Sequence, residues 1–154
     1  MHSHALSHRL REVFIDGKWI ANTNYQEQIT GLTVAQALQK PMGLNSIAAL
    51  TFHINYYLEG LIPVFNGQPL TIKDQYSFDL PLLQDQAAWE ALTQRLLTNA
   101  AVFIACVEKC TDTDLKQPFA EEKYGTYQRN IEGVLEHSYY HLGQIVLLRK
   151  MVFA

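Results

Sequence analysis

Apolar residues recur every three or four positions along three long segments of the chain, which is the period of an α-helix. These segments predict helices over residues 46–65, 85–110 and 126–152. A shorter pattern of the same period predicts a first helix over residues 5–15, and residues 33–39 are expected to form a short helix that ends before Pro41. No segment alternates apolar and polar residues as a strand does, so the chain is predicted to be all-α.

The connections between the predicted helices are long. Residues 66–84 contain Gly67, Pro69 and Pro81 and have no helical period. Fully extended, they would reach about 60 Å, whereas a 20-residue helix is ~30 Å long. The helices on either side therefore need not be antiparallel neighbours. Residues 111–125 form a second long connection, and residues 19–30 are expected to be irregular. This pattern predicts a four-helix bundle, with residues 1–154 as a single domain.

The composition argues against several classes of protein. Hydrophobic residues make up 48% of the chain, which is typical of a globular protein. The net charge is −3 without a basic cluster, so nucleic acid is not an expected partner. The longest apolar run, Ala100 to Val107, is far shorter than the ~18 residues that a membrane helix needs, and the first residues lack an apolar signal core. We expect a cytoplasmic protein without a membrane partner.

The only two cysteines, Cys106 and Cys110, are four residues apart in one predicted helix. They lie on its apolar stripe, so we expect reduced thiols that serve as small core residues. The alternative is a pair of soft metal ligands.

Three histidines are placed to share one metal ion. His137 and His141 lie four residues apart in the last predicted helix, so their Cβ atoms are about 6 Å apart on one face. His53 lies at the flank of the apolar stripe of the helix over residues 46–65. Helices packed about 8–10 Å apart can bring the three imidazoles together. Three neutral nitrogens suit zinc, nickel, copper or iron, and they leave a coordination position open. The alternative is that these histidines are hydrogen-bonded residues of the bundle without a metal.

Three further residues are candidates for supporting roles around these histidines. Tyr57 is the one tyrosine placed to approach them, as a proton donor or an orienting group. Asn130 and Gln144 share the histidine edge of the last helix and can orient a ligand. No catalytic residue is assigned.

Several neighbouring residues are expected to play no part in metal binding. Glu136 precedes the first histidine and faces away, unlike the glutamate of a His-Glu-x-x-His motif. Gly143 is expected to permit the close approach of a neighbouring helix. The first residues, with His2, His4 and His8, are expected to be frayed.

Five stretches taken in order resemble the DinB/YfiT-like superfamily. They are Asn45–Ala48, Phe52–Tyr57, Lys123–Gly125, Arg129–Asn130 and Glu136–Ile145. The most specific part of the resemblance is one histidine in the second long helix combined with His-x-x-x-His-x-Gly-Gln-Ile in the last.

The resemblance implies an up-down-down-up bundle and a site for one divalent metal, which is carried over to His53, His137 and His141. Members of the superfamily are often dimers, so we expect a homodimer, and we expect zinc or nickel as the metal. Some members of the superfamily are thiol-dependent transferases or isomerases that use a low-molecular-weight thiol such as bacillithiol or mycothiol. We therefore expect a metal-dependent transferase or hydrolase acting on a small molecule. The alternatives are a non-catalytic metal or small-molecule binder and a structural dimeric bundle.

Overall fold

The computed structural model describes residues 2–154, and helices make up 69% of the chain. The α-helices are α1 (His2–Arg11), α2 (Tyr25–Ile29), α3 (Val34–Leu38), α4 (Ile47–Phe65), α5 (Gln86–Lys109) and α6 (Tyr127–Val152). A π-helical segment, η1 (Glu12–Asp16), continues α1, and 3-10 turns form at η2 (Pro41–Gly43), η3 (Asp74–Tyr76), η4 (Asp114–Lys116) and η5 (Glu122–Tyr124). Residues 2–154 contain no strand, so the prediction of an all-α chain is confirmed.

Side-chain caps fix where the three long helices begin. Ser46, Asp85 and Thr126 each accept a hydrogen bond from the backbone amide three residues further on. Each of these caps pairs an amide that has no partner inside the helix. The helices therefore start within one residue of their predicted positions.

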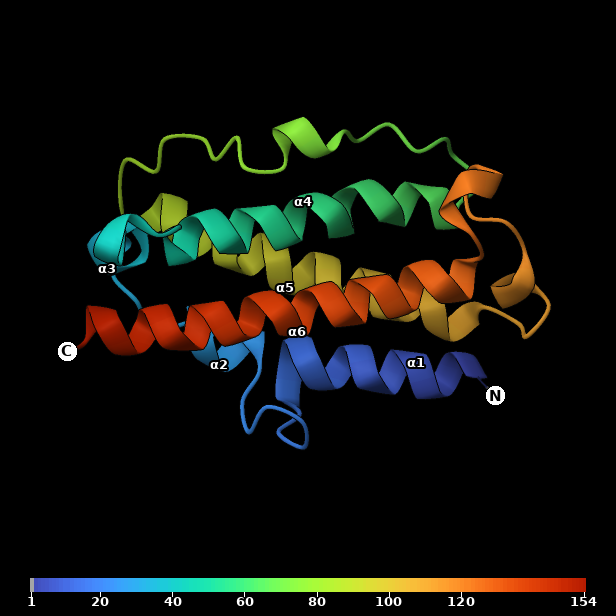
Figure 1. Cartoon of the computed structure of the whole chain (residues 1–154), viewed down its shortest axis with the longest axis horizontal. Coiled ribbons are helices and arrows are strands. Elements are labelled where there is room, and N and C mark those ends of the chain that lie inside the picture. Colours follow the sequence, from blue (N-terminus) through green and yellow to red (C-terminus); the bar gives the residue numbers. More distant parts are fainter. Residues whose placement is uncertain (1) are drawn as a thin grey trace.

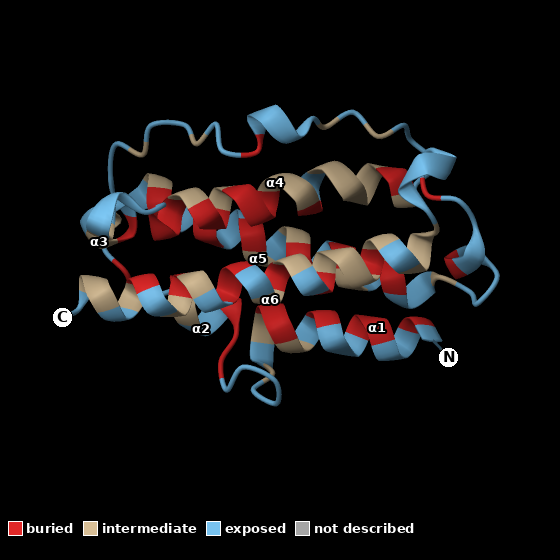
Figure 2. Ribbon diagram, in the orientation of Figure 1, coloured by how far each residue is buried: buried red, intermediate tan, exposed pale blue. Residues whose placement is uncertain are grey.

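The four longest helices lie side by side along the long axis of the molecule (Figure 1). α5 packs against α4 and α1, and α6 contacts the same two helices. α4 and α5 run in one direction, whereas α1 and α6 run in the opposite direction (Figure 1). The predicted apolar stripes face inward (Figure 2), and the core includes Ile54, Leu58, Leu96, Phe103, Leu135 and Leu142.

Residues 66–84, here called the strap, run along the outer side of α4 and join it to α5 (Figure 1). The strap was predicted to be structureless, but it contains the turn η3. It is docked on α4 by Tyr56, whose hydroxyl donates to the carbonyl of Lys73 at 2.8 Å and accepts from its amide at 3.0 Å. Ile72 lies against Gly60, where an added Cβ would come within 2.3 Å of the Ile72 Cγ2. Gly60 therefore leaves the space that lets the strap approach the helix.

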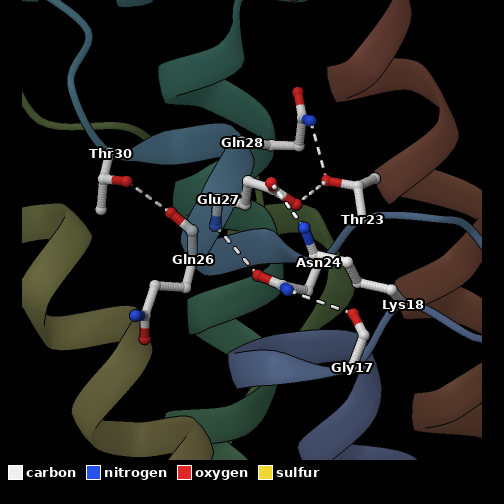
Figure 3. Close-up of polar contacts among 8 residues, drawn as sticks. All are labelled: Gly17, Lys18, Thr23, Asn24, Gln26, Glu27, Gln28 and Thr30. Carbon is white, nitrogen blue, oxygen red and sulfur yellow. Dashed lines mark hydrogen bonds and ion pairs between the residues drawn. The ribbon is translucent and has the colours of Figure 1, made fainter.

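The prediction that residues 19–30 are irregular is wrong, because α2 lies within them. Asn24 caps α2 by accepting from the amide of Glu27 at 2.9 Å. The Glu27 carboxylate accepts from the hydroxyl of Thr23 at 2.8 Å and pairs with Lys18 at 3.3 Å (Figure 3). The polar residues that suggested a loop are therefore the capping network of a short helix.

Two side chains anchor α2 to the rest of the protein. Tyr25 and Ile29 are fully buried, and the hydroxyl of Tyr25 donates to the carbonyl of Ser138 on α6 at 2.8 Å. Two apolar residues are too few to establish a helical period, so this helix had no signal in the sequence pattern.

The prediction that the first residues are frayed is also wrong. α1 begins at His2, and it packs against α5 with Ser3 and Ser7 buried. His4 and His8 are exposed, and His4 lies 3.4 Å from a carboxylate oxygen of Glu108 on α5. Ser3 and Ser7 continue the buried face of Leu6 and Leu10. Because serine is not apolar, the apolar pattern did not extend the predicted helix to His2.

Two further expectations need correction. Cys106 and Cys110 are free thiols, but both are only half-buried and line a cavity of about 570 Å³, and of the two Cys110 also packs against the core. Burial raises the pKa of both thiols. Gly143 is exposed, and an added Cβ would meet no atom within 4 Å, so it does not serve close helix approach.

Within residues 2–154, no helix combines the length and the hydropathy needed to cross a membrane.

Candidate metal centre

The three predicted histidines converge between α4 and α6. The Nε2 atom of His137 lies 3.1 Å from Nε2 of His53 and 3.0 Å from Nε2 of His141. Two nitrogens bound to one tetrahedral zinc ion are about 3.3 Å apart. The ligand atoms of the three histidines lie within 4.8 Å of one another. Within residues 2–154 no other group of three histidine, cysteine, aspartate or glutamate side chains is close enough to hold a metal.

The hydrogen bonds of the Nδ1 atoms fix which ring nitrogen of His53 and of His141 carries the proton. Nδ1 of His53 lies 3.3 Å from the carbonyl oxygen of Ser77, and Nδ1 of His141 lies 2.8 Å from Oε1 of Gln144. Carbonyl oxygens only accept hydrogen bonds, so both Nδ1 atoms donate and both Nε2 atoms present a lone pair.

These lone pairs point to one place. His137 Nε2 faces the other two Nε2 atoms, and its single proton, if present there, can satisfy only one of them. A cation at the centre satisfies all three nitrogens at once. The donor set of this site therefore fits a transition metal.

Burial keeps the three imidazoles neutral. His53 and His141 are 5% and 7% exposed, and His137 is half-buried. Removal from water, together with the neighbouring imidazoles, lowers the pKa of His53 and of His137 to about 4. Burial also lowers the pKa of His141. At neutral pH the cluster is therefore in the unprotonated form that binds metals.

The strap covers the cluster from one side. The ring of Phe78 stacks on His53 with centroids 4.0 Å apart and planes 13° apart. Ser77 is buried and supplies the carbonyl that orients His53. Sequence reasoning missed both residues, because their role depends on the strap lying over α4. No local motif marks them.

Two of the predicted supporting residues contact the histidines. Gln144 orients His141, as described above. The ring of Tyr57 packs edge-on against His53 and His137, with centroids 5.1 and 5.3 Å away. The hydroxyl of Tyr57 donates to a carboxylate oxygen of Asp74 at 3.0 Å, and burial raises the pKa of this phenol. Asp74 belongs to η3 and was not predicted.

The third candidate, Asn130, is used differently. Its amide donates to the carbonyls of Tyr124 and Thr126 at 2.8 and 2.9 Å, so it ties the preceding connection to α6. Glu136 lies on the exposed side of α6 and pairs with Arg129 at 3.1 Å, consistent with its exclusion as a ligand.

A cavity of about 590 Å³ opens beside His137 and Tyr57, between α4, the strap and α6. Its apolar lining is Leu61, Leu70, Ile72, Phe119 and Val134, and its polar lining includes Lys73, Asp74, Arg129 and Asn130. The volume is that of a site for a small molecule.

The fold and the site thus define an all-helical protein with a three-histidine cluster beside an open cavity. The chain belongs to the DinB superfamily, whose family model matches residues 21–145, a range that includes all three histidines. No curated protein and no solved structure gives a significant match to the chain.

Proposed function

We propose that this protein is a metal-dependent enzyme of the DinB superfamily in which His53, His137 and His141 hold one divalent transition metal, zinc or nickel. The observation that carries the proposal is the convergence of the three Nε2 atoms, two of which have their lone pairs fixed by bonds on the opposite side of the ring. Three imidazoles leave room for a further ligand, as in catalytic sites.

The proposed reaction is a thiol-dependent transfer to a small molecule, or its hydrolysis. The metal, when bound, supplies the Lewis-acid chemistry that lowers the pKa of a thiol or a water molecule. Tyr57, held by Asp74, is placed to give or take a proton at its phenol oxygen. Phe78 keeps water from His53, and the adjoining cavity receives the substrate and a low-molecular-weight thiol.

We further propose that the fold that carries this site is a four-helix bundle with up-down-down-up topology. Its support is the course of the chain in Figure 1, where the strap returns along α4 so that α5 runs parallel to it. This crossover is what lays Ser77 and Phe78 over His53.

We also propose that the protein is a cytoplasmic homodimer. Tyr140 and Leu147 are 65% and 56% exposed and lie two turns apart on α6, which supports a contact between two copies there. Sedimentation equilibrium of the wild type and of Tyr140→Glu tests this point. A monomeric wild type contradicts it.

Metal content per chain, measured by mass spectrometry on protein purified without a histidine tag, tests the central proposal. The wild type is compared with His137→Ala and with His8→Ala. His8→Ala is the matched control, because His8 also has a second histidine four residues away, His4, but this pair lies on the exposed face of α1. We expect one metal per chain in the wild type and in His8→Ala, and none in His137→Ala.

Other outcomes would redirect the assignment. Equal metal content in the two variants would place the metal elsewhere. No uptake by any of the three proteins, even with added zinc or nickel, would favour a structural helical protein. Stoichiometric metal without turnover of any thiol and electrophile pair above a His53→Ala control would favour a non-catalytic binder.

A further inference from the structure

One face of α6 carries a row of residues that extends away from the metal centre. Arg129, Gly133 and His137 are spaced by four residues, and all three line the cavity of about 590 Å³. A step of four residues advances about 6 Å along a helix. Arg129 is therefore about 12 Å along the helix axis from the histidine of the cluster.

The middle of this row is hollow. A Cβ added at Gly133 would meet no atom within 4 Å, although this position is half-buried and lines the cavity. Leu61 of α4 and Ile72 of the strap line the same cavity. The space over Gly133 therefore suits an apolar group.

The far end of the row offers unused hydrogen-bond donors. Arg129 uses only its Nη1 atom, which donates to both carboxylate oxygens of Glu136 at 3.2 and 3.1 Å. Its Nη2 and Nε atoms bond to no other described residue. An exposed pair of this kind contributes little stability, so the guanidinium can also bind a second anion.

A second cation faces the same cavity. Lys73 of the strap lines it, and its ammonium group makes no ion pair within residues 2–154. The carboxylate in the cavity lining, Asp74, is occupied by the hydroxyl of Tyr57. The lining therefore presents two cations, Arg129 and Lys73, and the carboxylate of Asp74, while Glu136 pairs with Arg129 from the exposed side of α6.

We propose that this cavity binds an elongated organic acid. The reacting atom lies at the histidine cluster, the apolar body lies over Gly133, and the carboxylate is held by Arg129 with Lys73. This inference rests on the proposed function and adds the class of substrate and the residues that select it.

The probes are ω-mercaptoalkanoic acids of increasing chain length and the ω-mercaptoalkanols of the same lengths. Binding to the cobalt-loaded protein is followed by the absorption band that a thiol produces when it binds cobalt. We expect no preference for the acid at short chain lengths. Once the chain spans the row, the acid should bind about tenfold more tightly than the alcohol, as for a hydrogen bond to a charged group.

Two arginine variants test which residue holds the carboxylate. Arg129→Gln should abolish the preference for the long acid. Arg95→Gln should retain it, because Arg95 is also an exposed arginine paired with a glutamate, Glu59, but lies on α5 outside the cavity.

Two glycine variants test the position of the apolar body. Gly133→Gln should weaken binding of the long acid while 2-mercaptoethanol binds as before. Gly143→Gln is the matched control, because an added Cβ there also meets no atom within 4 Å. Both changes remove a glycine from the interior of α6, so neither should lower the melting temperature.

The outcomes separate this inference from the function on which it rests. Equal affinity for acids and alcohols at every length, or equal effects of the two glycine variants, would overturn the inference alone. A protein whose cobalt responds to no thiol would overturn the thiol-dependent function and this inference with it.

Discussion

Two pairs of histidines in this protein have the same spacing and different surroundings. His4 and His8 on α1 are four residues apart, as are His137 and His141 on α6. The first pair is exposed, and His4 faces a carboxylate of α5. The second pair meets His53 from α4, and Nε2 of His137 lies 3.1 Å from that of His53 and 3.0 Å from that of His141. The four-residue spacing creates a histidine pair on both helices, but among the described residues only the pair on α6 is joined by a third histidine, His53.

The two pairs also differ in what covers them. The strap lays Phe78 on His53 and supplies the carbonyl of Ser77 to its ring. Cover of this kind removes water, which keeps the imidazoles neutral and fixes their lone pairs. Convergence and cover, rather than spacing, therefore distinguish the candidate metal centre from the pair on α1. Four experiments test this difference between the two pairs.

The largest effect is expected from removing the third ligand. His53→Ala should weaken metal binding by more than ~100-fold, beyond the upper range for losing a group that only supports a ligand. Competition with a chromophoric chelator measures this affinity. The double variant His4→Ala/His8→Ala should bind metal as the wild type does. If it lost the metal instead, the comparison between the two pairs would fail.

A smaller loss of metal affinity is expected from removing the residue that hydrogen-bonds to one of the three histidines. Gln144→Leu deletes the acceptor that orients His141 while keeping a side chain of similar size. The affinity for metal should fall about 10–100-fold, in the same competition assay. Gln94→Leu on α5 is the control, because that glutamine bonds only to exposed Thr98. Unchanged affinity in Gln144→Leu would mean that His141 needs no orienting partner.

The strap can be loosened without touching a histidine. In Gly60→Ala the new Cβ would lie 2.3 Å from Cγ2 of Ile72, so the strap must shift. We expect Gly60→Ala to be about 1 kcal/mol less stable than a glycine-to-alanine change at an open helix position, at the lower end for overpacking because Ile72 is half-buried and can move.

Urea unfolding measures this change, with Gly143→Ala as the control. The control has open space around the new methyl group and should gain up to about 1 kcal/mol from helix propensity. Equal changes in the two variants would show that the strap does not bear on Gly60.

The stability of the metal-free protein should also depend on pH. The pKa of His53 and of His137 is about 4 in the folded state and about 6.5 in an unfolded chain. Between these values the unfolded chain binds more protons, so the free energy of unfolding falls as the pH drops from about 6.5 toward 4 and is unaffected by these groups above 6.5.

Urea titrations across this range give the slope. The double variant His53→Ala/His137→Ala should have a shallower slope than the wild type, whereas His4→Ala/His8→Ala should keep it. A wild-type slope in the first double variant would mean that other groups carry the pH dependence.

The local sequence was sufficient to predict features that depend on interactions within a few residues. The caps at Ser46, Asp85 and Thr126 and the apolar period placed the long helices within a residue or two. The spacing of His137 and His141 required only that α6 be a helix. By contrast, α2 was missed because two buried residues, Tyr25 and Ile29, make too short a pattern.

Tertiary structure decided what depends on segments meeting across the chain. His53 is 84 residues from His137, and only the packing of α4 against α6 brings them together. The positions of Ser77 and Phe78 follow from the course of the strap. The open space at Gly133 exists because no atom of the neighbouring segments comes within 4 Å of an added Cβ there. The helices and the histidine pair could be predicted from sequence alone, since both arise from interactions within a few residues. Convergence and cover arise from contacts between distant segments, which no local pattern encodes.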